Sequence, residues 1–265
     1  MKILKISILG ILIFSLSCSN VPLTGRKQFT AIPSSQMLAL SADSYQQVLS
    51  EIQISASNEY TESVKRVGQR LMLAVEKYLA QNGLESRIDG FDWQFNVLIS
   101  EELNAWCMPG GQIAFYEGIM PVCGDDNGVA IVMGHEIAHA VAKHGNERLS
   151  QQLLINMGGM ALSEALKTKK EETQQLALLA FGVGTSLGVA LPYSRTHETE
   201  ADELGLYFMA MAGYDPQTAP AFWERMEAAG GARPPEFLST HPDPSNRIAH
   251  LKEIMPKALE YYTSR

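Results

Sequence analysis

The spacing of apolar residues along the chain predicts a mostly helical protein with a small sheet. From Ser41 to Gln81 apolar positions recur every three or four residues, and one helical face carries Val64, Val67, Leu71, Val75 and Leu79. Similar spacing predicts helices at 126–144, on both sides of a charged break at 167–172 within 147–191, and at 196–212, 217–229 and 244–262. Alternation over 91–99 and a short run at 112–116 predict strands. The expected fold class is therefore α+β, predominantly helical.

Capping and helix-breaking residues set the expected ends of these helices. Asp125-Asp126-Asn127 offers N-cap residues for the helix at 126–144, and Gly145 is expected to end that helix. The apolar stretch 176–191 stops at Pro192 and has about sixteen residues, whereas a transmembrane helix needs about 20. We therefore expect a buried core helix there. The alternative is an element that lies on a membrane or covers a functional site.

The first residues have the layout of an export signal. A short basic start precedes an apolar run at 6–16, which is too short to span a bilayer comfortably. Leu16-Ser17-Cys18 resembles the lipobox of bacterial lipoproteins. This resemblance implies that residues 1–17 are removed and that Cys18 becomes the lipidated first residue of the mature chain.

The residues after the signal refine the expected location and domain structure. Ser19 follows the lipidated cysteine, which favours the periplasmic side of the outer membrane; a soluble periplasmic or secreted protein is the alternative. The turn-rich segment 18–36 is expected to be a tether. The remainder, 37–265, is long enough for one domain with a substantial core.

The composition excludes several classes of protein. Hydrophobic residues make up 46% of the 265 residues and charged residues 19%, which excludes a wholly disordered chain. The net charge is −8 and no run of Lys or Arg occurs, so no nucleic-acid partner is expected, because phosphate binding needs concentrated positive charge. Besides Cys18 the chain has Cys107 and Cys123. These two could form a disulfide in an oxidising compartment or remain buried thiols.

Two histidines four residues apart form a metal-binding pattern, His135-Glu136-Ile137-Ala138-His139. Residues at this spacing share a helical face, so both imidazoles can grip one Zn²⁺ ion. Glu136 lies about 100° around the helix, where its carboxylate can take a proton from water on the metal. The surrounding helix is apolar, and two imidazoles without a partner would be costly there. The pattern therefore predicts a metal site.

A third protein ligand is expected, because catalytic zinc sites usually have three. The acidic start of the helix at 196–212 supplies the candidates His197, Glu198, Glu200, Asp202 and Glu203. Glu198 and Asp202 are four residues apart and share a face, whereas Glu200 points elsewhere. We therefore expect Glu198 to bind the metal and Asp202 either to bond a ligand histidine and fix its tautomer or to steer the site. The other histidines are expected at the surface or at helix ends: His144, His197 and His250.

These motifs resemble those of a known family. His-Glu-Ile-Ala-His, followed about sixty residues later by Ser-Arg-x-x-Glu-x-x-Ala-Asp, is the pattern of the HtpX/CaaX-prenyl-protease family of zinc metallopeptidases, metallopeptidase family 48. The likeness is greatest to its exported BepA-like and LoiP-like branch and to the mitochondrial Oma peptidases, and it covers roughly residues 20–255. It implies a zincin-like domain with one zinc ion on His135, His139 and Glu198. It also implies Glu136 as general base and Asp202 as a supporting acid.

Two further segments match this family. Asn104-Ala105, with Pro-Gly-Gly at 109–111, matches the segment that leads to an edge strand. Ser-Thr-His-Pro at 239–242, with Arg247 after it, matches a C-terminal His-Pro motif. The resemblance implies that His241 lies near the metal. There it would stabilise the oxyanion or bind zinc as a fourth ligand that keeps the enzyme latent.

The function that these features predict is a zinc-dependent endopeptidase of the bacterial cell envelope that cleaves misfolded or unassembled exported proteins. An extended substrate would pair with the strand at 112–116 and contact Gln112 and Ile113. Asn104 and the carbonyl of Ala105 would hold its backbone, and His241 or Arg247 would steady the oxyanion. One alternative is a zinc-stabilised chaperone or adaptor with a latent, His241-capped site. Another is a metal-dependent hydrolase of non-peptide substrates.

Overall fold

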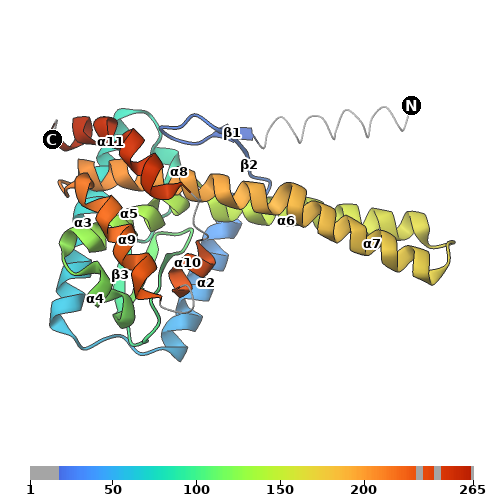
Figure 1. Cartoon of the computed structure of the whole chain (residues 1–265), viewed down its shortest axis with the longest axis horizontal. Coiled ribbons are helices and arrows are strands. Elements are labelled where there is room, and N and C mark those ends of the chain that lie inside the picture. Colours follow the sequence, from blue (N-terminus) through green and yellow to red (C-terminus); the bar gives the residue numbers. More distant parts are fainter. Residues whose placement is uncertain (1–17, 231–234, 242–245, 264–265) are drawn as a thin grey trace.

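Helices form most of the chain in the computed structural model, which describes residues 18–230, 235–241 and 246–263. The expected signal segment 1–17 lies outside the described residues. The helices, seen in Figure 1, are α2 (Ser34–Glu51), α3 (Asn58–Gln81), α4 (Met120–Cys123), α5 (Asp126–Val141), α6 (His144–Leu166), α7 (Glu171–Thr185), α8 (Leu191–Met211), α9 (Ala219–Ala229), α10 (Glu236–Thr240) and α11 (Arg247–Thr263). The short helical turns are η1 (Glu85–Arg87), η2 (Glu117–Ile119), η3 (Ser186–Ala190) and η4 (Pro216–Thr218).

Two small sheets accompany the helices, so the predicted α+β, mostly helical class is confirmed. The strands are β1 (Cys18–Asn20), β2 (Lys27–Phe29), β3 (Gln94–Leu98), β4 (Ala105–Cys107) and β5 (Gln112–Tyr116). β1 and β2 form an antiparallel hairpin. In the other sheet β5 lies between β3, which is parallel to it, and β4, which is antiparallel. The expected strand at 112–116 is therefore central, and the expectation that it offers an exposed edge is wrong.

The predicted apolar stripe of α3 is buried, as its spacing requires. All five of its side chains have no exposed surface: Val64, Val67, Leu71, Val75 and Leu79. Burial of an aliphatic side chain of this size contributes about 1.5–3 kcal/mol. The stripe packs against α5, α8 and β3, so it fixes the layer on which the metal-binding helix rests.

α5 and α8 cross at two glycines, and their contact is the most extensive between any two described elements. A Cβ atom on Gly134 of α5 would lie 2.8 Å from the carbonyl oxygen of Gly205. A Cβ atom on Gly205 of α8 would lie 2.7 Å from the backbone nitrogen of His135. Only glycine allows this approach at both positions. The crossing brings the middle of α8 against the histidine-bearing turn of α5.

The chain reverses direction between α5 and α6 at a left-handed residue. α5 ends at Val141, and Lys143 has φ 58°, a conformation usually taken by glycine at a helix end. α6 then begins at His144. The prediction that Gly145 ends the helix is therefore wrong, since Gly145 lies in the first turn of α6, where an added Cβ atom would lie 3.6 Å from Pro109.

Helices α6, α7 and the first part of α8 form a long arm that projects from the body (Figure 1). The break at 167–172 lies at its tip, as the sequence predicts. The expected stop at Pro192 is wrong, because the helix from Glu171 continues to Met211. The π-helical turn η3 immediately precedes Pro192. In a regular α-helix a proline ring clashes with the carbonyl four residues earlier and removes one backbone hydrogen bond. The wider π-helical turn makes room for the ring, so the helix continues.

The arm is not a core element, so the expectation of a buried helix at 176–191 is wrong. Within α7, which the structure describes in full, no side chain is buried. Leu176, Leu179 and Leu187 are 67%, 66% and 63% exposed. By length and composition the helix Glu171–Met211 is the one described helix that could cross a membrane, and none of its apolar window is buried.

The segment expected to be a tether is folded against the domain. Val21 is buried in the hydrophobic core beside the β1–β2 hairpin. Gln28 is also buried and donates to the carbonyl of Ala142 at 2.6 Å, just after α5. The hairpin therefore belongs to the structure that surrounds the helix α5.

The glycine crossing can be tested by adding one methyl group. Gly205→Ala places a Cβ atom against the backbone of α5 and is expected to reduce the free energy of unfolding by about 1–3 kcal/mol. Gly182→Ala is the matched control, because its Cβ atom would meet nothing within 4 Å. The control is expected to be neutral or to stabilise by up to about 1 kcal/mol through helix propensity. Denaturant unfolding followed by circular dichroism measures both; equal effects would contradict the close packing.

Candidate metal centre

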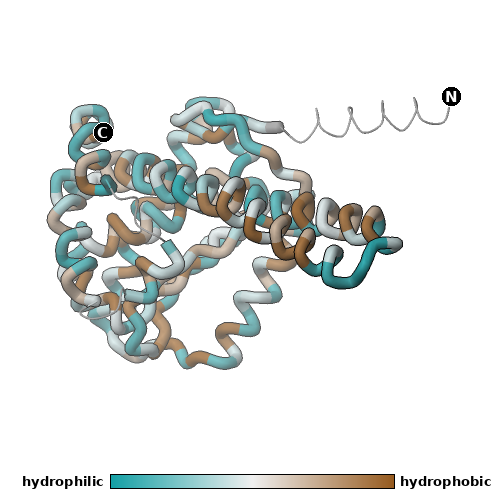
Figure 2. The backbone as a smooth tube through the Cα atoms, turned by 45° about the vertical axis from the view of Figure 1, so that its right-hand side comes forward, coloured by the Kyte–Doolittle hydropathy of each residue, from teal (hydrophilic) through white to brown (hydrophobic). Residues whose placement is uncertain are grey.

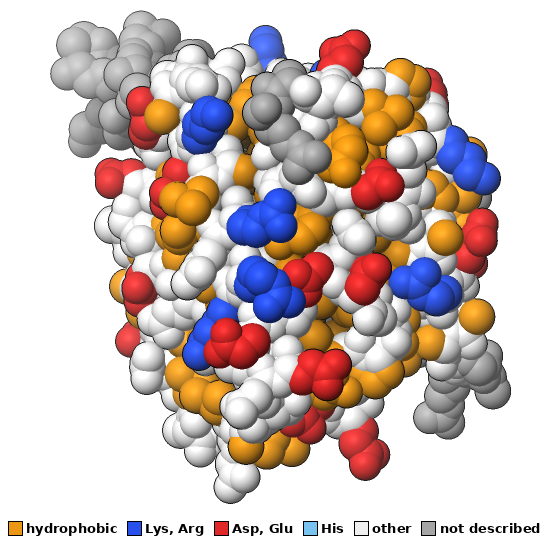
Figure 3. Space-filling model, turned by 90° about the vertical axis from the view of Figure 1, so that its left-hand side faces the viewer, with side chains coloured by type: hydrophobic (Ala, Val, Ile, Leu, Met, Phe, Trp, Pro, Cys, Tyr) orange, Lys and Arg blue, Asp and Glu red, His pale blue; other side chains and the backbone are white. Residues whose placement is uncertain are grey.

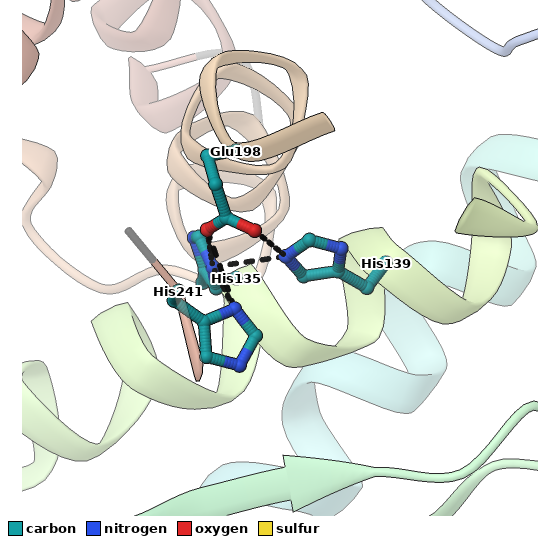
Figure 4. A group of neighbouring side chains, drawn as sticks. All are labelled: His135, His139, Glu198 and His241. Atoms are coloured by element: carbon teal, nitrogen blue, oxygen red, sulfur yellow. Dashed lines mark hydrogen bonds and ion pairs between the residues drawn. The ribbon is translucent and has the colours of Figure 1, made fainter. Parts of the chain in front are cut away.

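The two histidines of α5 point toward one spot, as their spacing predicts. His135 and His139 are both buried, and their Nε2 atoms are 3.0 Å apart (Figure 4). A hydrogen bond between these atoms would need one of them to carry a proton. The Nδ1 atom of each ring has a hydrogen-bond partner of its own. Those partners show which nitrogen of each ring carries the proton.

The neighbour of His135 is Asp202, on α8. Asp202 Oδ1 lies 2.9 Å from His135 Nδ1, and an ionised carboxylate can only accept, so Nδ1 carries the proton. In the neutral ring that a metal ligand requires, the Nε2 atom of His135 is then a lone pair. Burial lowers the pKa of His135, but Asp202 and Glu198 outweigh that effect and raise it to about 9, so without a metal this nitrogen binds a proton. The contact of Asp202 with His135 is the one that the i, i+4 spacing of Glu198 and Asp202 predicts.

The neighbours of His139 lead to the same result through a second histidine. His144 Nε2 lies 2.9 Å from the carboxylate of Glu200 and must donate to it. Burial lowers the pKa of His144 well below its usual value, so the ring is neutral and its Nδ1 accepts. His139 Nδ1, 2.9 Å away, therefore donates, and His139 Nε2 is also a bare lone pair. The two Nε2 atoms can therefore share a proton on His135 or, when both rings are neutral, bind one metal cation between them.

Glu198 of α8 completes the group with a negative charge. Its Oε2 atom is 3.2 Å from His135 Nε2, and its Oε1 atom is 3.5 Å from His139 Nε2. Burial alone would raise the pKa of Glu198, but the imidazoles around it hold that pKa well below its usual value. One carboxylate oxygen and the nitrogens of His135, His139 and His241 lie within 4.8 Å of one another. Imidazole and carboxylate donors in this number suit Zn²⁺.

His241, at the end of α10, lies among these ligand atoms. Its Nδ1 atom is 3.3 Å from both His135 Nε2 and Glu198 Oε2 (Figure 4). Its Nε2 atom is 3.4 Å from Glu136 Oε1, and its ring stacks on Phe237. His241 is therefore close enough to bind the same cation or to contact a group bound to it. Pro242 of the predicted motif lies outside the described residues.

Glu136 lies beside the ligand group without being part of it. Its Oε2 atom accepts a hydrogen bond from the backbone N–H of Cys107 at 3.2 Å. Burial raises the pKa of Glu136 above its usual value, which brings a carboxylate closer to the range in which it exchanges protons at neutral pH. Glu136 and His139 both line a cleft of about 360 Å³ on the open side of the ligand group.

Arg247 lies behind the ligand group, so the expectation that it contacts substrate is wrong. It is 2% exposed, and its Nε atom donates to Asp202 Oδ2 at 2.7 Å. Its guanidinium lies 4.1 Å from the centre of the Trp223 ring. Asp202 therefore stands between Arg247 and His135, and this arrangement keeps the carboxylate ionised and fixed.

The strand nearest the cleft is β4. Tyr116 donates to the carbonyl of Asn104, and Met108 donates to that of Gln112, so alternate residues of this segment bond β5. The residues between them turn their backbone groups away from β5, and the N–H of Cys107 points to Glu136. The outer edge of β4 therefore faces the helix α5.

The expected substrate contacts divide between this edge and the core. Gln112 and Ile113 are buried in the central strand and cannot contact a substrate directly, so that part of the prediction is wrong. Ala105 lies in the edge strand with a buried side chain, and Asn104 is next to it. Their backbone groups remain candidates for substrate binding. Trp106, which the sequence did not single out, lines the cleft.

A second layer of charged residues holds the ligand group, and the sequence did not indicate it. Arg26, from the turn after β1, bonds Glu200 through Nε at 2.9 Å and Glu147 through its terminal nitrogen at 2.8 Å. Thr24 also donates to Glu200. Since Glu200 fixes His144, the N-terminal hairpin is connected to the metal ligand His139 through a continuous chain of hydrogen bonds.

His144 and His197 belong to this layer. His144 begins α6, so the expected place at a helix end is confirmed although its side chain is buried, whereas the expectation that His197 is exposed is wrong. Both are buried, and their rings stack with centroids 4.2 Å apart. His197 Nε2 lies 2.9 Å from Glu147 Oε2. Burial raises the pKa of Glu147, but hydrogen bonds from His197 and Arg26 outweigh that effect and hold it at about 2. The remaining histidine, His250, is half-buried in the first turn of α11.

The two cysteines of the domain are free thiols rather than a disulfide. Cys107 is in β4 and Cys123 ends α4. Burial raises the pKa of both thiols, that of Cys123 to about 12. Neither thiol is therefore ionised at neutral pH, and neither belongs to the candidate ligand group.

Removal of the Arg26 side chain tests the second layer. Arg26→Ala leaves Glu147 and Glu200 without their shared cation and is expected to reduce the free energy of unfolding by about 2–4 kcal/mol. Because His144 then loses its fixed partner, metal affinity at His139 is expected to fall about tenfold. Arg66→Ala is the control, since its ion pair with Asp126 is largely exposed and contributes at most about 1 kcal/mol. Similar losses in both variants would contradict the role of Arg26.

The chain is similar to known proteins over most of its length. The profile of peptidase family M48 matches residues 59–255. The chain is 31% identical to the mitochondrial metalloendopeptidase OMA1 of Schizosaccharomyces pombe, over 90% of this chain and 66% of that protein. It is 35% identical to the Saccharomyces cerevisiae OMA1, over 67% of this chain and 51% of that protein. With the beta-barrel assembly-enhancing protease of Escherichia coli the identity is 29%, over 60% of this chain and 34% of the relative.

The chain therefore spans between about a third and two thirds of the length of these relatives. The range matched by the family profile contains the histidine pair, Glu198, Asp202, His241 and Arg247. The resemblance inferred from the motifs is confirmed, and this chain belongs to peptidase family M48.

Proposed function

We propose that the chain is a zinc-dependent endopeptidase that holds one zinc ion on His135, His139 and Glu198. The observation that carries this proposal is the convergence of two imidazole lone pairs and one carboxylate beside a cleft that Glu136 also lines. When bound, zinc supplies Lewis acidity that polarises a carbonyl and makes water more acidic. Membership of a metallopeptidase family supports the same conclusion.

Glu136 is the proposed general base. It takes a proton from the attacking water and later gives that proton to the leaving amine of the substrate. Its burial and its raised pKa suit this exchange, and the hydrogen bond from Cys107 holds the carboxylate toward the cleft. Asp202, backed by Arg247, acts as a positioning residue that keeps His135 in the tautomer able to bind the metal.

A polypeptide substrate would lie along the outer edge of β4. A strand edge binds peptide backbone without demanding a particular sequence, which suits a protease of unfolded chains. The carbonyl of Ala105 and the backbone of Asn104 are the proposed partners, in place of the central strand β5. The side of the cleft formed by Trp106, Phe91 and Met37 is apolar, which suits side chains that a folded protein would bury.

The proposed location is the bacterial cell envelope, with export by residues 1–17 and acylation of Cys18. The proposed substrates are misfolded or unassembled exported proteins. The name of the Escherichia coli relative, which refers to β-barrel assembly, supports an envelope role. Other relatives are named as mitochondrial, so membrane-enclosed compartments recur among the matched proteins.

A latent protein that binds clients and rarely cuts them is the second proposed function. The position of His241, 3.3 Å from two of the ligand residues, favours this alternative in the resting chain. A fourth protein ligand would occupy the place that water needs. The latent protein then corresponds to His241 at the metal, and the active peptidase to His241 away from it.

Glu136→Gln tests the proposed base. The variant should bind one zinc per chain, because the ligands are unchanged, but its cleavage of casein should fall by about 10²–10⁴. Metal analysis and a casein assay with and without phenanthroline measure the two effects. Glu102→Gln, an exposed substitution outside the cleft, should leave both unchanged. Near-normal turnover by Glu136→Gln would refute the assignment.

His241→Ala tests whether this histidine caps the site. Because its Nδ1 atom lies at a ligand position, we expect the variant to retain zinc and to cleave casein severalfold faster than the unaltered chain. The same casein assay, with Glu136→Gln combined with His241→Ala as a blank, gives the rate. A rate that falls instead would assign His241 to the stabilisation of the oxyanion.

A further inference from the structure

The arm of α6, α7 and early α8 exposes many apolar side chains. Exposed large apolar residues cluster there far more than elsewhere among the described residues: Leu149, Leu153, Leu154, Met157, Met160, Leu176, Leu179, Val183, Leu187, Leu191 and Tyr193. Figure 2 shows the arm as mainly hydrophobic along its length and hydrophilic at its tip. The face of the body opposite to the arm is different, since charged side chains of both signs are mixed with apolar ones there (Figure 3).

The uncharged band of the second helix of the arm has the length of a bilayer core, and that of α6 is shorter, about 22 Å over 149–163. Residues 173–194 contain no Asp, Glu, Lys or Arg. As a continuous helix these 22 residues extend about 33 Å, close to the roughly 30 Å of the hydrocarbon layer. Arg195 ends this uncharged band toward the body, and Glu172 ends it toward the tip. On the neighbouring helix α6, residues 149–163 are uncharged as well.

The interior of the arm is suited to a place without water. The ring of Phe181 on α7 packs on α6, where a Cβ atom added to Gly158 would lie 3.0 Å from it. Small residues of this kind let two helices approach closely in a membrane. Two polar side chains within the band bond inside their own helices: Thr185 donates to the carbonyl of Phe181, and Gln152 donates to the side-chain oxygen of Asn156. The backbone groups are paired within the helices, as a lipid environment demands.

The helix Glu171–Met211 is apolar without being a core helix or an export signal. A core helix of a soluble protein would be buried, but none of the apolar window of this helix is buried. An export signal would lie at the N-terminus, and this helix lies far from it. We propose that the arm inserts into a lipid bilayer as a helical hairpin, with its charged tip at 164–172 on the far side and the body against the near surface. This proposal does not depend on the peptidase activity or on acylation of Cys18.

Insertion would place the cleft at the membrane surface. Arg148 and Leu149, at the base of the arm, line the same cleft as Glu136 and His139. The hairpin that begins at Cys18 also packs at this end, through contacts of β2 with α6. A membrane-embedded arm would therefore present the site to chains that emerge from, or fail to enter, the same bilayer.

Vesicle flotation of the mature chain carrying Cys18→Ser, which removes any acyl anchor, tests insertion. Vesicles of phosphatidylethanolamine and phosphatidylglycerol should carry this protein upward. Leu179→Lys with Leu187→Lys adds two charges to exposed positions of the band, and partition should fall by a factor of about 100 or more. Leu40→Lys with Leu73→Lys adds the same charges to exposed positions of the body and should change nothing. Equal flotation of the two variants, or no flotation of the parent, would overturn the proposal.

Trypsin added to sealed vesicles separates insertion from binding at the surface. Lys167, Lys169 and Lys170 at the tip are exposed, so trypsin should cut there in detergent solution. In vesicles the tip should be protected until the bilayer is dissolved. Cleavage at the same rate in intact vesicles would overturn the proposal, as would a stable dimer in solution that needs the arm and does not bind vesicles.

Discussion

The close crossing of α5 and α8 determines where the candidate metal ligands lie. Gly134 and Gly205 let the two backbones touch, and one turn of each helix then faces the other. The histidine pair and Glu198 meet because of this contact, although about sixty residues separate them in the chain. A cation resolves the electrostatic conflict that the crossing creates, since it joins two lone pairs and one buried carboxylate.

Around this group the buried charges of the protein orient the ligand side chains. One imidazole is held by Asp202 and Arg247, and the other by His144 and Glu200. Each chain of hydrogen bonds starts at an ionised carboxylate and ends by leaving an Nε2 lone pair free for metal. The two ligand tautomers are therefore determined by residues that never touch the metal. One of these chains reaches the N-terminal hairpin, so that hairpin is part of the site's support.

The sequence predicts the features that follow from the periodicity of a single helix, and it predicts fewer of those that depend on contacts between distant segments. The α3 stripe, the histidine pair and the Glu198–Asp202 spacing all follow from helical periodicity, which holds wherever the helix packs. The second layer could not be inferred, because Arg26 and Glu147 lie more than a hundred residues apart and no local pattern relates them. The edge strand is misassigned for a similar reason: strand order is a property of the sheet and is invisible in the alternation of one strand.

For the arm, the sequence shows the composition of the helices but not their surroundings. Its apolar composition is evident from the sequence. If Pro192 ended the helix, the apolar stretch would be too short to span a membrane, and its length would favour a core helix. The π-helical turn before that proline lets the helix continue to Met211. The exposure of the apolar side chains, which only the structure provides, then distinguishes a core helix from a helix suited to a lipid bilayer.

X-ray absorption at the zinc edge, on purified protein with measured metal content, tests whether zinc binds to the two histidines and Glu198. We expect one zinc per chain with nitrogen and oxygen neighbours at about 2.0–2.2 Å, and loss of the metal in Glu198→Ala. Sulfur neighbours at about 2.3 Å, or full zinc content in that variant, would contradict it.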